Sequence, residues 1–227
     1  NQLNTSIHTD FWMHAMTLSG ENDPRLYQLT TPGENGNYFS VPASEGRGAL
    51  DIEDFAILYD GYWTKDDSPI VFITDEELYF IEAEAAFYTN DLARAYQAYL
   101  NGIERNFQRL GVGEEFENYR NSSAVVQSAS ELEISDIMMQ KYIALYLQPE
   151  TWVDMRRYGY SNHAYPELEY PANALPIYNG EWIKRMPYDP QTEYIYNPNE
   201  IERLGARSET WVITPFWWIE NSTLSNP

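Results

Sequence analysis

Apolar and small residues recur at helical spacing in two neighbouring stretches near the middle of the chain. The first stretch spans about residues 75–89, a short turn follows it, and Gly111 stands just after the second. Thr74 and Glu77 have the spacing of a capping box, in which each side chain accepts the backbone N–H of the other residue. A glycine after the last apolar position is typical of a helix end. The pattern predicts an antiparallel helix pair over residues 74–110.

Small residues within this pair lie where two helices would touch. Ala83 and Ala95 are followed by Tyr99 and Gly102. Small residues let two helices approach closely while the aromatic rings fill the groove beside them, and this arrangement resembles one tetratricopeptide repeat. The repeat does not recur along the chain. A single repeat cannot bury its apolar face alone, so we expect the pair to pack on other helices.

A second helical pattern covers residues 130–159. Ser130 and Glu133 have capping-box spacing, and the apolar residues after them share one helical face. These residues are Ile134, Ile137, Met138, Tyr142 and Leu145. Pro149 either ends this helix or sits in the first turn of the next one, and Gly159 closes the second. We therefore expect a second helix pair.

The remaining segments have weaker patterns. Residues 1–20 show the spacing of a short amphipathic helix, and residues 55–63 and 70–73 are interpreted as short strands or extended segments. Prolines concentrate in residues 160–227, which predicts an irregular tail held by packing onto a rigid body. The expected anchors of that tail are Trp211, Trp217 and Trp218.

Together these patterns predict one fold for residues 1–227. We expect a single, mainly α domain with tetratricopeptide-like helical pairs, long irregular loops and few short strands.

Composition excludes several function classes. The net charge is −21 with only 14 Lys and Arg, which argues against the basic face that nucleic acid or anionic lipid requires. The chain has no cysteine, so disulfides, thiolate metal sites and a cysteine nucleophile are excluded. No apolar run has the ~18 residues of a membrane span. Asn1 begins no signal peptide, and we expect a mature or truncated piece of a longer chain.

Aromatic residues carry the best functional signal, with 19 Tyr, 9 Phe and 7 Trp. A ring plane packs against the apolar face of a sugar, while neighbouring polar side chains bond the sugar hydroxyls. Aromatic clusters in predicted loops therefore suggest a glycan-binding platform. Its candidate residues are Trp12, Tyr38, Phe39, Tyr62 and Trp63. The alternative is that these rings wedge the loops onto the core.

Catalytic and metal-binding patterns are weak. A glycosidase needs two carboxylates facing each other across a sugar, but Glu77, Glu82 and Glu84 share one predicted helix, where a solvated acidic face is the simpler interpretation. Residues 51–54 and 66–67 offer oxygen ligands for calcium without EF-hand spacing. We therefore predict no catalytic residue, no metal ligand and no cofactor, with a structural calcium ion as an open alternative.

One charged cluster is interpreted as structural. Asp154 and Arg157 are three residues apart and can pair on a helix. The guanidinium groups of Arg156 and Arg157 can also hold carboxylates or carbonyls of the tail. We predict that Asp154, Arg156 and Arg157 latch the tail, with a ligand-binding role as the alternative.

Four sequence blocks agree in order with the SusD/RagB family of outer-membrane glycan-binding lipoproteins, which the chain resembles over most of its length. They are residues 22–26 (NDPRL), 76–104, 137–158 (IMMQKYIALYLQPETWVDMRRY) and 184–188 (KRMPY). The joint order of the blocks is more specific than any one of them.

The resemblance implies a helical protein with tetratricopeptide-like helices on the extracellular face of a Bacteroidetes outer membrane. It implies glycan binding without catalysis and delivery of the glycan to a SusC-like TonB-dependent transporter. No cofactor is required, although relatives bind calcium. The chain resembles only the C-terminal half of full members, so the lipid anchor that would hold it peripherally on the membrane is expected outside this chain.

Two other function classes stay open on the sequence. One is a glycoside hydrolase, and the other is a protein-interaction module, since tetratricopeptide helices often bind peptides.

Overall fold

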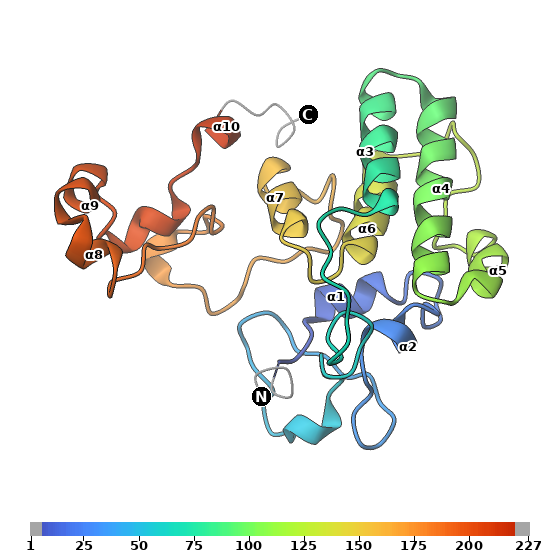
Figure 1. Cartoon of the computed structure of the whole chain (residues 1–227), viewed down its shortest axis with the longest axis horizontal. Coiled ribbons are helices and arrows are strands. Elements are labelled where there is room, and N and C mark those ends of the chain that lie inside the picture. The colour runs from blue at the N-terminus through green and yellow to red at the C-terminus, as the bar shows by residue number, and fades with distance from the viewer. Residues whose placement is uncertain (1–5, 221–227) are drawn as a thin grey trace.

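A computed structural model describes residues 6–220, and helices dominate it. The central pair is α3 (Asp75–Tyr88) and α4 (Leu92–Arg109), which run antiparallel (Figure 1). The predicted helix pair and the mainly α fold are therefore confirmed. Thr74 Oγ1 accepts the Glu77 N–H at 3.3 Å, which caps the start of α3.

The two central helices touch through small residues. Ala83 and Ala95 are fully buried. A Cβ atom added to Gly102 would lie 2.9 Å from the ring of Phe80, so only glycine allows the two helices to approach this closely.

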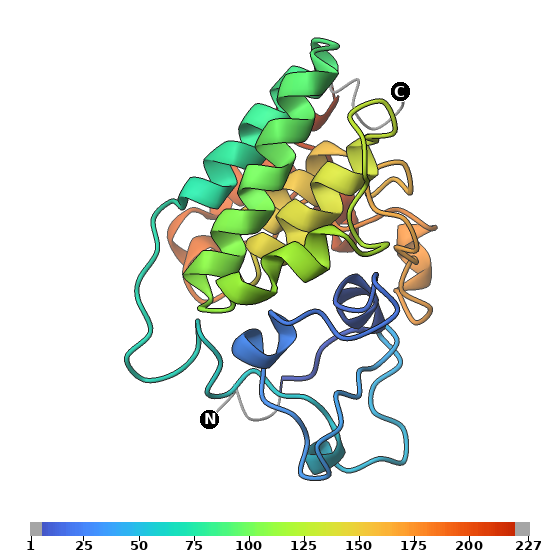
Figure 2. The same cartoon turned by 90° about the vertical axis from the view of Figure 1, so that its right-hand side faces the viewer.

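The second helix pair consists of α6 (Ile134–Ala144) and α7 (Glu150–Arg157). The predicted capping residue Ser130 was wrong by one turn: Glu133 caps α6 in a capping box with Asp136. Pro149 is the N-cap of α7. Helix α6 packs on both α3 and α4, with α5 (Phe116–Arg120) at the far end of α4 (Figure 2). The central pair thus obtains the helical neighbours that it needs.

The N-terminal region is less helical than predicted. Helix α1 is limited to Asp10–Ala15 and α2 to Leu26–Leu29, and residues 1–5 of the predicted first helix lie outside the described residues. Of the two interpretations given for these segments, the short strands were wrong. Phe55 and Ile57 form isolated bridges, such as Phe39 with Phe55, while residues 58–63 are bends and turns and residues 70–73 are a largely exposed loop. A strand needs neighbouring strands to stabilise it, and residues 6–220 contain isolated bridges but no strand.

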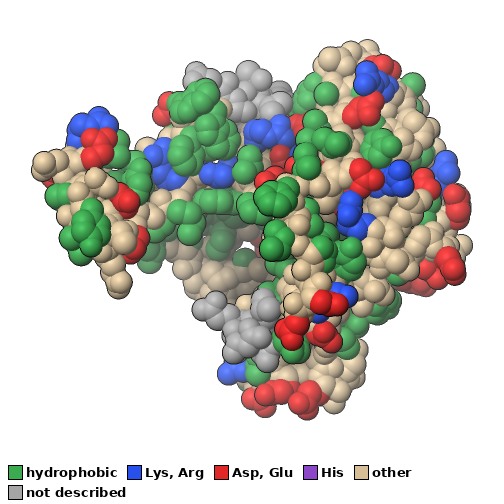
Figure 3. Space-filling view, viewed as in Figure 1, with side chains coloured by type: hydrophobic (Ala, Val, Ile, Leu, Met, Phe, Trp, Pro, Cys, Tyr) green, Lys and Arg blue, Asp and Glu red, His purple; other side chains and the backbone are tan. Residues whose placement is uncertain are grey.

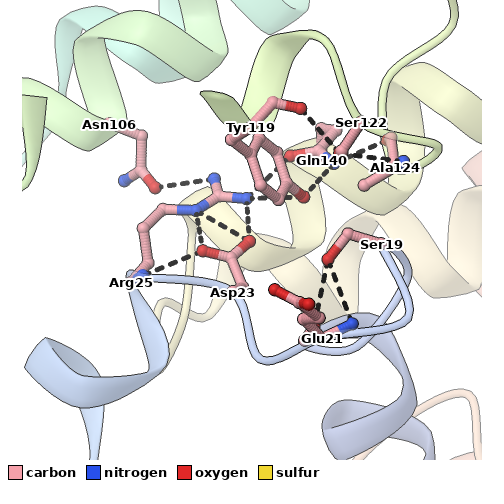
Figure 4. A network of polar contacts seen from close by, with 9 residues as sticks. All are labelled: Ser19, Glu21, Asp23, Arg25, Asn106, Tyr119, Ser122, Ala124 and Gln140. Carbon is pink, nitrogen blue, oxygen red and sulfur yellow. Dashed lines mark hydrogen bonds and ion pairs between the residues drawn. The ribbon is translucent and has the colours of Figure 1, made fainter. Parts of the chain in front are cut away.

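A buried arginine joins the N-terminal region to the helices (Figure 4). Arg25 is fully buried and pairs with Asp23 at 2.6 Å. Its guanidinium also donates to Asn106 of α4 at 3.0 Å and to Gln140 of α6 at 2.9 Å. The hydroxyl of Tyr119 on α5 completes the set at 3.2 Å. The NDPRL block therefore fastens one loop to three helices.

In the tail after α7, regular structure as far as residue 220 is limited to short helices. They are η4 (Pro176–Tyr178), α8 (Glu193–Tyr196), α9 (Pro198–Leu204), η5 (Glu209–Ile213) and α10 (Trp217–Glu220). The other short elements are η2 (Ile52–Asp54) and η3 (Gly113–Glu115).

Residues 189–213, here called the tail lobe, have a small apolar cluster of their own and lie apart from the helices in Figure 1. Trp211 anchors this cluster. Trp217 is 76% exposed, whereas Trp218 stacks on Phe216 at 5.7 Å. The assignment of residues 1–227 to one domain stays a prediction.

Candidate functional site

A groove opens between α1, the loop of residues 42–45 and the tail segment 167–172. Its first part has a volume of about 480 Å³. A second part of about 440 Å³ continues along residues 173–183 and shares Tyr170, Pro171 and Trp182 with the first. Figure 3 shows the molecule hollowed between the helices and the tail, with hydrophobic side chains around the hollow.

Aromatic rings line both parts of this groove. They are Phe11, Tyr142, Tyr160, Tyr170, Tyr178 and Trp182. Tyr160 and Trp182 stack with ring centroids 4.5 Å apart and planes only 5° from parallel. Tyr170 meets Trp182 edge-on at 5.2 Å. The three rings form a rigid apolar surface, hereafter the aromatic plate.

Local turn chemistry places Trp182 on this plate. After η4, Asn179 and Gly180 both adopt positive φ, at 49° and 82°, which these two residue types tolerate best. The Glu181 N–H then donates to the Tyr178 carbonyl at 2.8 Å, and the chain turns back. Trp182 therefore returns to lie against Tyr160.

Hydrogen bonds hold the partners of Trp182 in place. Trp152 of α7 donates its ring N–H to the Tyr160 hydroxyl at 2.8 Å, and that hydroxyl donates to the Ile183 carbonyl at 2.5 Å. The Tyr170 hydroxyl donates to the Glu181 carbonyl at 3.2 Å. Both tyrosine rings thus have a fixed orientation before any ligand arrives.

Polar groups complete the groove. Asp10, Glu45, Glu167 and Glu169 line the first part, together with His14. In the second part, the backbone N–H of Asn173 donates to Ser44 Oγ at 2.9 Å, and its side chain donates to the Ser44 carbonyl at 3.1 Å. This pair ties the N-terminal loop to the tail. The groove thus combines flat apolar rings with hydrogen-bonding groups.

The sequence-predicted residue Trp12 lies elsewhere, in the core. Its ring is 4% exposed and stacks on His8 at 4.2 Å. Nδ1 of His8 donates to the Ala56 carbonyl at 3.3 Å, so its Nε2 accepts from the Tyr146 hydroxyl at 2.5 Å. Burial lowers the pKa of His8 to about 4. This arrangement packs α1 onto the end of α6 and leaves little of Trp12 exposed.

The other four predicted residues lie near α2. Tyr38 is half-buried and meets Tyr27 edge-on at 5.6 Å, while Phe39 is 45% exposed. Tyr62 and Trp63 form a T-shaped pair at 4.6 Å and pack against the core. None of the five predicted residues is among those lining the groove. Their glycan-binding role stays a prediction.

The charged cluster on α7 contacts two regions. Asp154 pairs with Lys141 of α6 and with Arg157, at 2.7 Å each. Arg157 also holds Glu84 of α3 at 2.5 Å. These contacts join three helices.

The third member of this cluster reaches the tail. Arg156 donates to the Lys184 carbonyl at 3.1 Å and lies 3.9 Å above the ring of Trp152. Its guanidinium is also 5.4 Å from the ring of Trp218. Arg156 therefore contacts the tail, while the latch role of Asp154, Arg156 and Arg157 stays a prediction.

Two of the three glutamates considered for catalysis, Glu82 and Glu84, form ion pairs. Burial alone would raise the pKa of Glu84, but the bonds from Arg157 and Tyr158 hold it below its ordinary value. Glu82 pairs with Arg94 at 2.7 Å. In the described part of the chain, no group of three or more acidic or histidine side chains is arranged to hold a metal ion. Within that same part, no helix has both the length and the apolarity to cross a membrane.

Sequence reasoning missed the aromatic plate. Its residues belong to an irregular segment without helical or strand periodicity, and they match no motif. The available signal was the high density of Tyr between Tyr158 and Tyr178, followed by the Asn179-Gly180 turn that reverses the chain just before Trp182.

Comparison with solved structures supports the fold. A SusD homologue from Parabacteroides distasonis superposes with a TM-score of 0.63 at 26% identity, over 89% of this chain and 45% of that one. A chitin-binding protein superposes with a TM-score of 0.64 at 20% identity, over 93% of this chain and 49% of that one. The chain thus spans about half the length of these structures. No match was found among curated protein sequences.

Comparison with protein families covers most of the sequence. Residues 4–189 match the SusD-like family described as "Starch-binding associating with outer membrane". That span includes α1 to α7 and the aromatic plate, and the fold agrees with the solved SusD homologue. The chain therefore belongs to the SusD-like family.

Proposed function

We propose that this chain binds oligosaccharides without cleaving them, with the aromatic plate as the central sugar contact. The observation that carries the proposal is the parallel stack of Trp182 on Tyr160 beside the edge of Tyr170. Rigid rings lose little conformational entropy on binding. Family membership supports the ligand class, because the family is described as starch-binding.

The cellular setting is part of the same proposal. The protein acts on the outer face of the outer membrane and passes glycan to a SusC-like TonB-dependent transporter. The family description, which mentions association with the outer membrane, supports the location. Copurification of such a transporter with the full-length protein tests the partnership, and recovery of the protein without it would contradict this part.

Isothermal titration against a panel of oligosaccharides tests the binding site. Trp182→Ala removes the centre of the plate and is expected to weaken binding about tenfold or more. Tyr170→Ala should weaken binding to a smaller extent, because Tyr170 contributes only an edge. Tyr196→Ala is the matched control, since Tyr196 is 78% exposed and does not line the groove.

Two results would contradict the proposal. One is unchanged affinity in Trp182→Ala together with a loss in Trp63→Ala, which would move the site to the residues near α2. The other is release of shortened sugars during incubation, which would indicate a hydrolase. Chromatography of the sugar after incubation separates binding from turnover.

A further inference from the structure

The groove that contains the aromatic plate carries several acidic side chains, one histidine and no Lys or Arg. Asp10, Glu45, Glu167 and Glu169 line its first part, and Glu181 lines its second. Neither Lys nor Arg occurs among the lining residues of either part. A cleft lined with charges of one sign concentrates ligands of the opposite sign and repels ligands of the same sign.

Three of these carboxylates remain available to a ligand. Asp10 accepts a hydrogen bond from Ser40 at 2.5 Å, and Glu181 pairs with Lys184 at 2.6 Å. Glu45, Glu167 and Glu169 are exposed and form no ion pair with another described residue. Glu167 and Glu169 lie two residues apart in the segment just before Tyr170 of the aromatic plate.

The position of these carboxylates beside the plate determines what they would meet. A sugar ring that packs on Trp182 and Tyr170 extends its substituents towards the first part of the groove, which shares both residues. An ammonium group there would gain charge-assisted hydrogen bonds. A carboxylate or sulfate group would meet like charges, and no Lys or Arg lines the groove to compensate them.

Building on the proposed glycan site, we propose that the groove prefers oligosaccharides bearing free amino groups, such as glucosamine oligomers, and rejects those bearing uronic acids. Glu167 and Glu169 are the specificity-determining residues. Neutral sugars bind through the aromatic plate alone, and their affinity lies between those of the amino sugars and the uronic acids.

Titration of three tetrasaccharides tests this preference at a mildly acidic pH where the sugar amines are protonated. The ligands are tetramers of glucosamine, N-acetylglucosamine and galacturonic acid. The glucosamine tetramer is expected to bind about fivefold more tightly than the N-acetylated one at low salt, as expected for exposed charge pairs. Added salt should shrink this difference because it screens exposed charges.

The double variant Glu167→Gln/Glu169→Gln should lose most of the preference while its affinity for the N-acetylated tetramer stays the same. Glu202→Gln/Glu209→Gln is the matched control, since it removes two exposed carboxylates that do not line the groove.

The outcomes separate this inference from the binding site itself. Binding of the galacturonic acid tetramer as tightly as the glucosamine tetramer overturns the charge preference and leaves the plate intact. A preference that persists in Glu167→Gln/Glu169→Gln also overturns the proposed charge preference and leaves the plate intact. If none of the three tetramers binds and Trp182→Ala changes nothing, the glycan site fails and the preference fails with it.

Discussion

At the scale of single residues, Arg25 shows how a buried charge is stabilised in this protein. The side chain has no exposed surface, yet partners on three helices and Asp23 meet its donors. Removing one member of such a set leaves the other charge buried without compensation, which is more costly than losing the pair as a whole.

Arg25→Met is therefore expected to destabilise the fold by about 3–5 kcal/mol. Denaturant unfolding followed by circular dichroism measures the loss. The double variant Asp23→Asn/Arg25→Met should recover part of it, because it leaves no unpaired charge. Arg203→Met, at an exposed pair with Glu200, is the control and should leave the stability almost unchanged. Equal losses at the two arginines would contradict the role of burial.

His8 makes stability depend on pH in a defined window. Its pKa is lowered by burial from 6.5 to about 4, so the unfolded chain binds a proton more readily than the folded one. The contribution of the uncharged His8 ring to the free energy of unfolding is fully present above pH 6.5 and is lost as pH falls towards 4. Its size is on the order of 3 kcal/mol.

Thermal unfolding of the natural protein and of His8→Gln at several pH values checks this prediction. The variant has no titrating ring, so the difference in stability between the two proteins should narrow as the pH falls through the window. A constant difference would show that His8 does not titrate as described.

At the scale of elements, the contact between α3 and α4 depends on a glycine inside a helix. Alanine normally favours a helix over glycine by about 1 kcal/mol. At Gly102, however, the added methyl group would lie 2.9 Å from the ring of Phe80. Overpacking of this kind costs about 1–3 kcal/mol.

Gly102→Ala is therefore expected to lower the denaturant midpoint in spite of its better helix propensity. Gly102→Ala/Phe80→Leu should recover stability relative to Gly102→Ala, because a smaller side chain makes room for the methyl group. A stabilised single variant would show that the ring moves aside freely.

The helices were predictable from sequence because their signals are local. Periodicity, the cap at Thr74 and the break at Pro149 each depend on a few consecutive residues. The N-cap of α6 was misplaced because two pairs of residues have the three-residue spacing of a capping box. The prediction chose Ser130 with Glu133, whereas the structure uses Glu133 with Asp136.

The groove was less predictable since it is assembled from distant segments. Ser44 and Asn173 lie 129 residues apart in sequence, and no pattern along the chain shows that they meet. The prediction of short strands near residue 55 was wrong for a related reason. Strand formation depends on neighbouring segments that sequence periodicity does not identify.

At the scale of the whole molecule, two apolar clusters differ greatly in size. The large one includes α1 to α6, whereas that of the tail lobe contains only three buried residues, Ile201, Ala206 and Trp211. A region with few buried apolar contacts can open locally at a low cost in free energy.

Amides of α9 should therefore exchange with solvent hydrogen much faster than those of α4. Native-state hydrogen exchange followed by mass spectrometry measures both helices in one experiment. Protection of α9 as strong as that of α4 would mean that the tail lobe and the helices unfold as one cooperative unit.

The network around Arg25 also has a consequence for the order of synthesis. Arg25 and its partner Gln140 are 115 residues apart, which corresponds to roughly 6–23 seconds of translation at typical rates. Until Gln140 has been synthesised, the hydrogen-bond partners of Arg25 are incomplete and the NDPRL turn stays exposed to solvent. A hydrated arginine and aspartate keep that waiting segment soluble, whereas an apolar residue of the same size would expose it to aggregation.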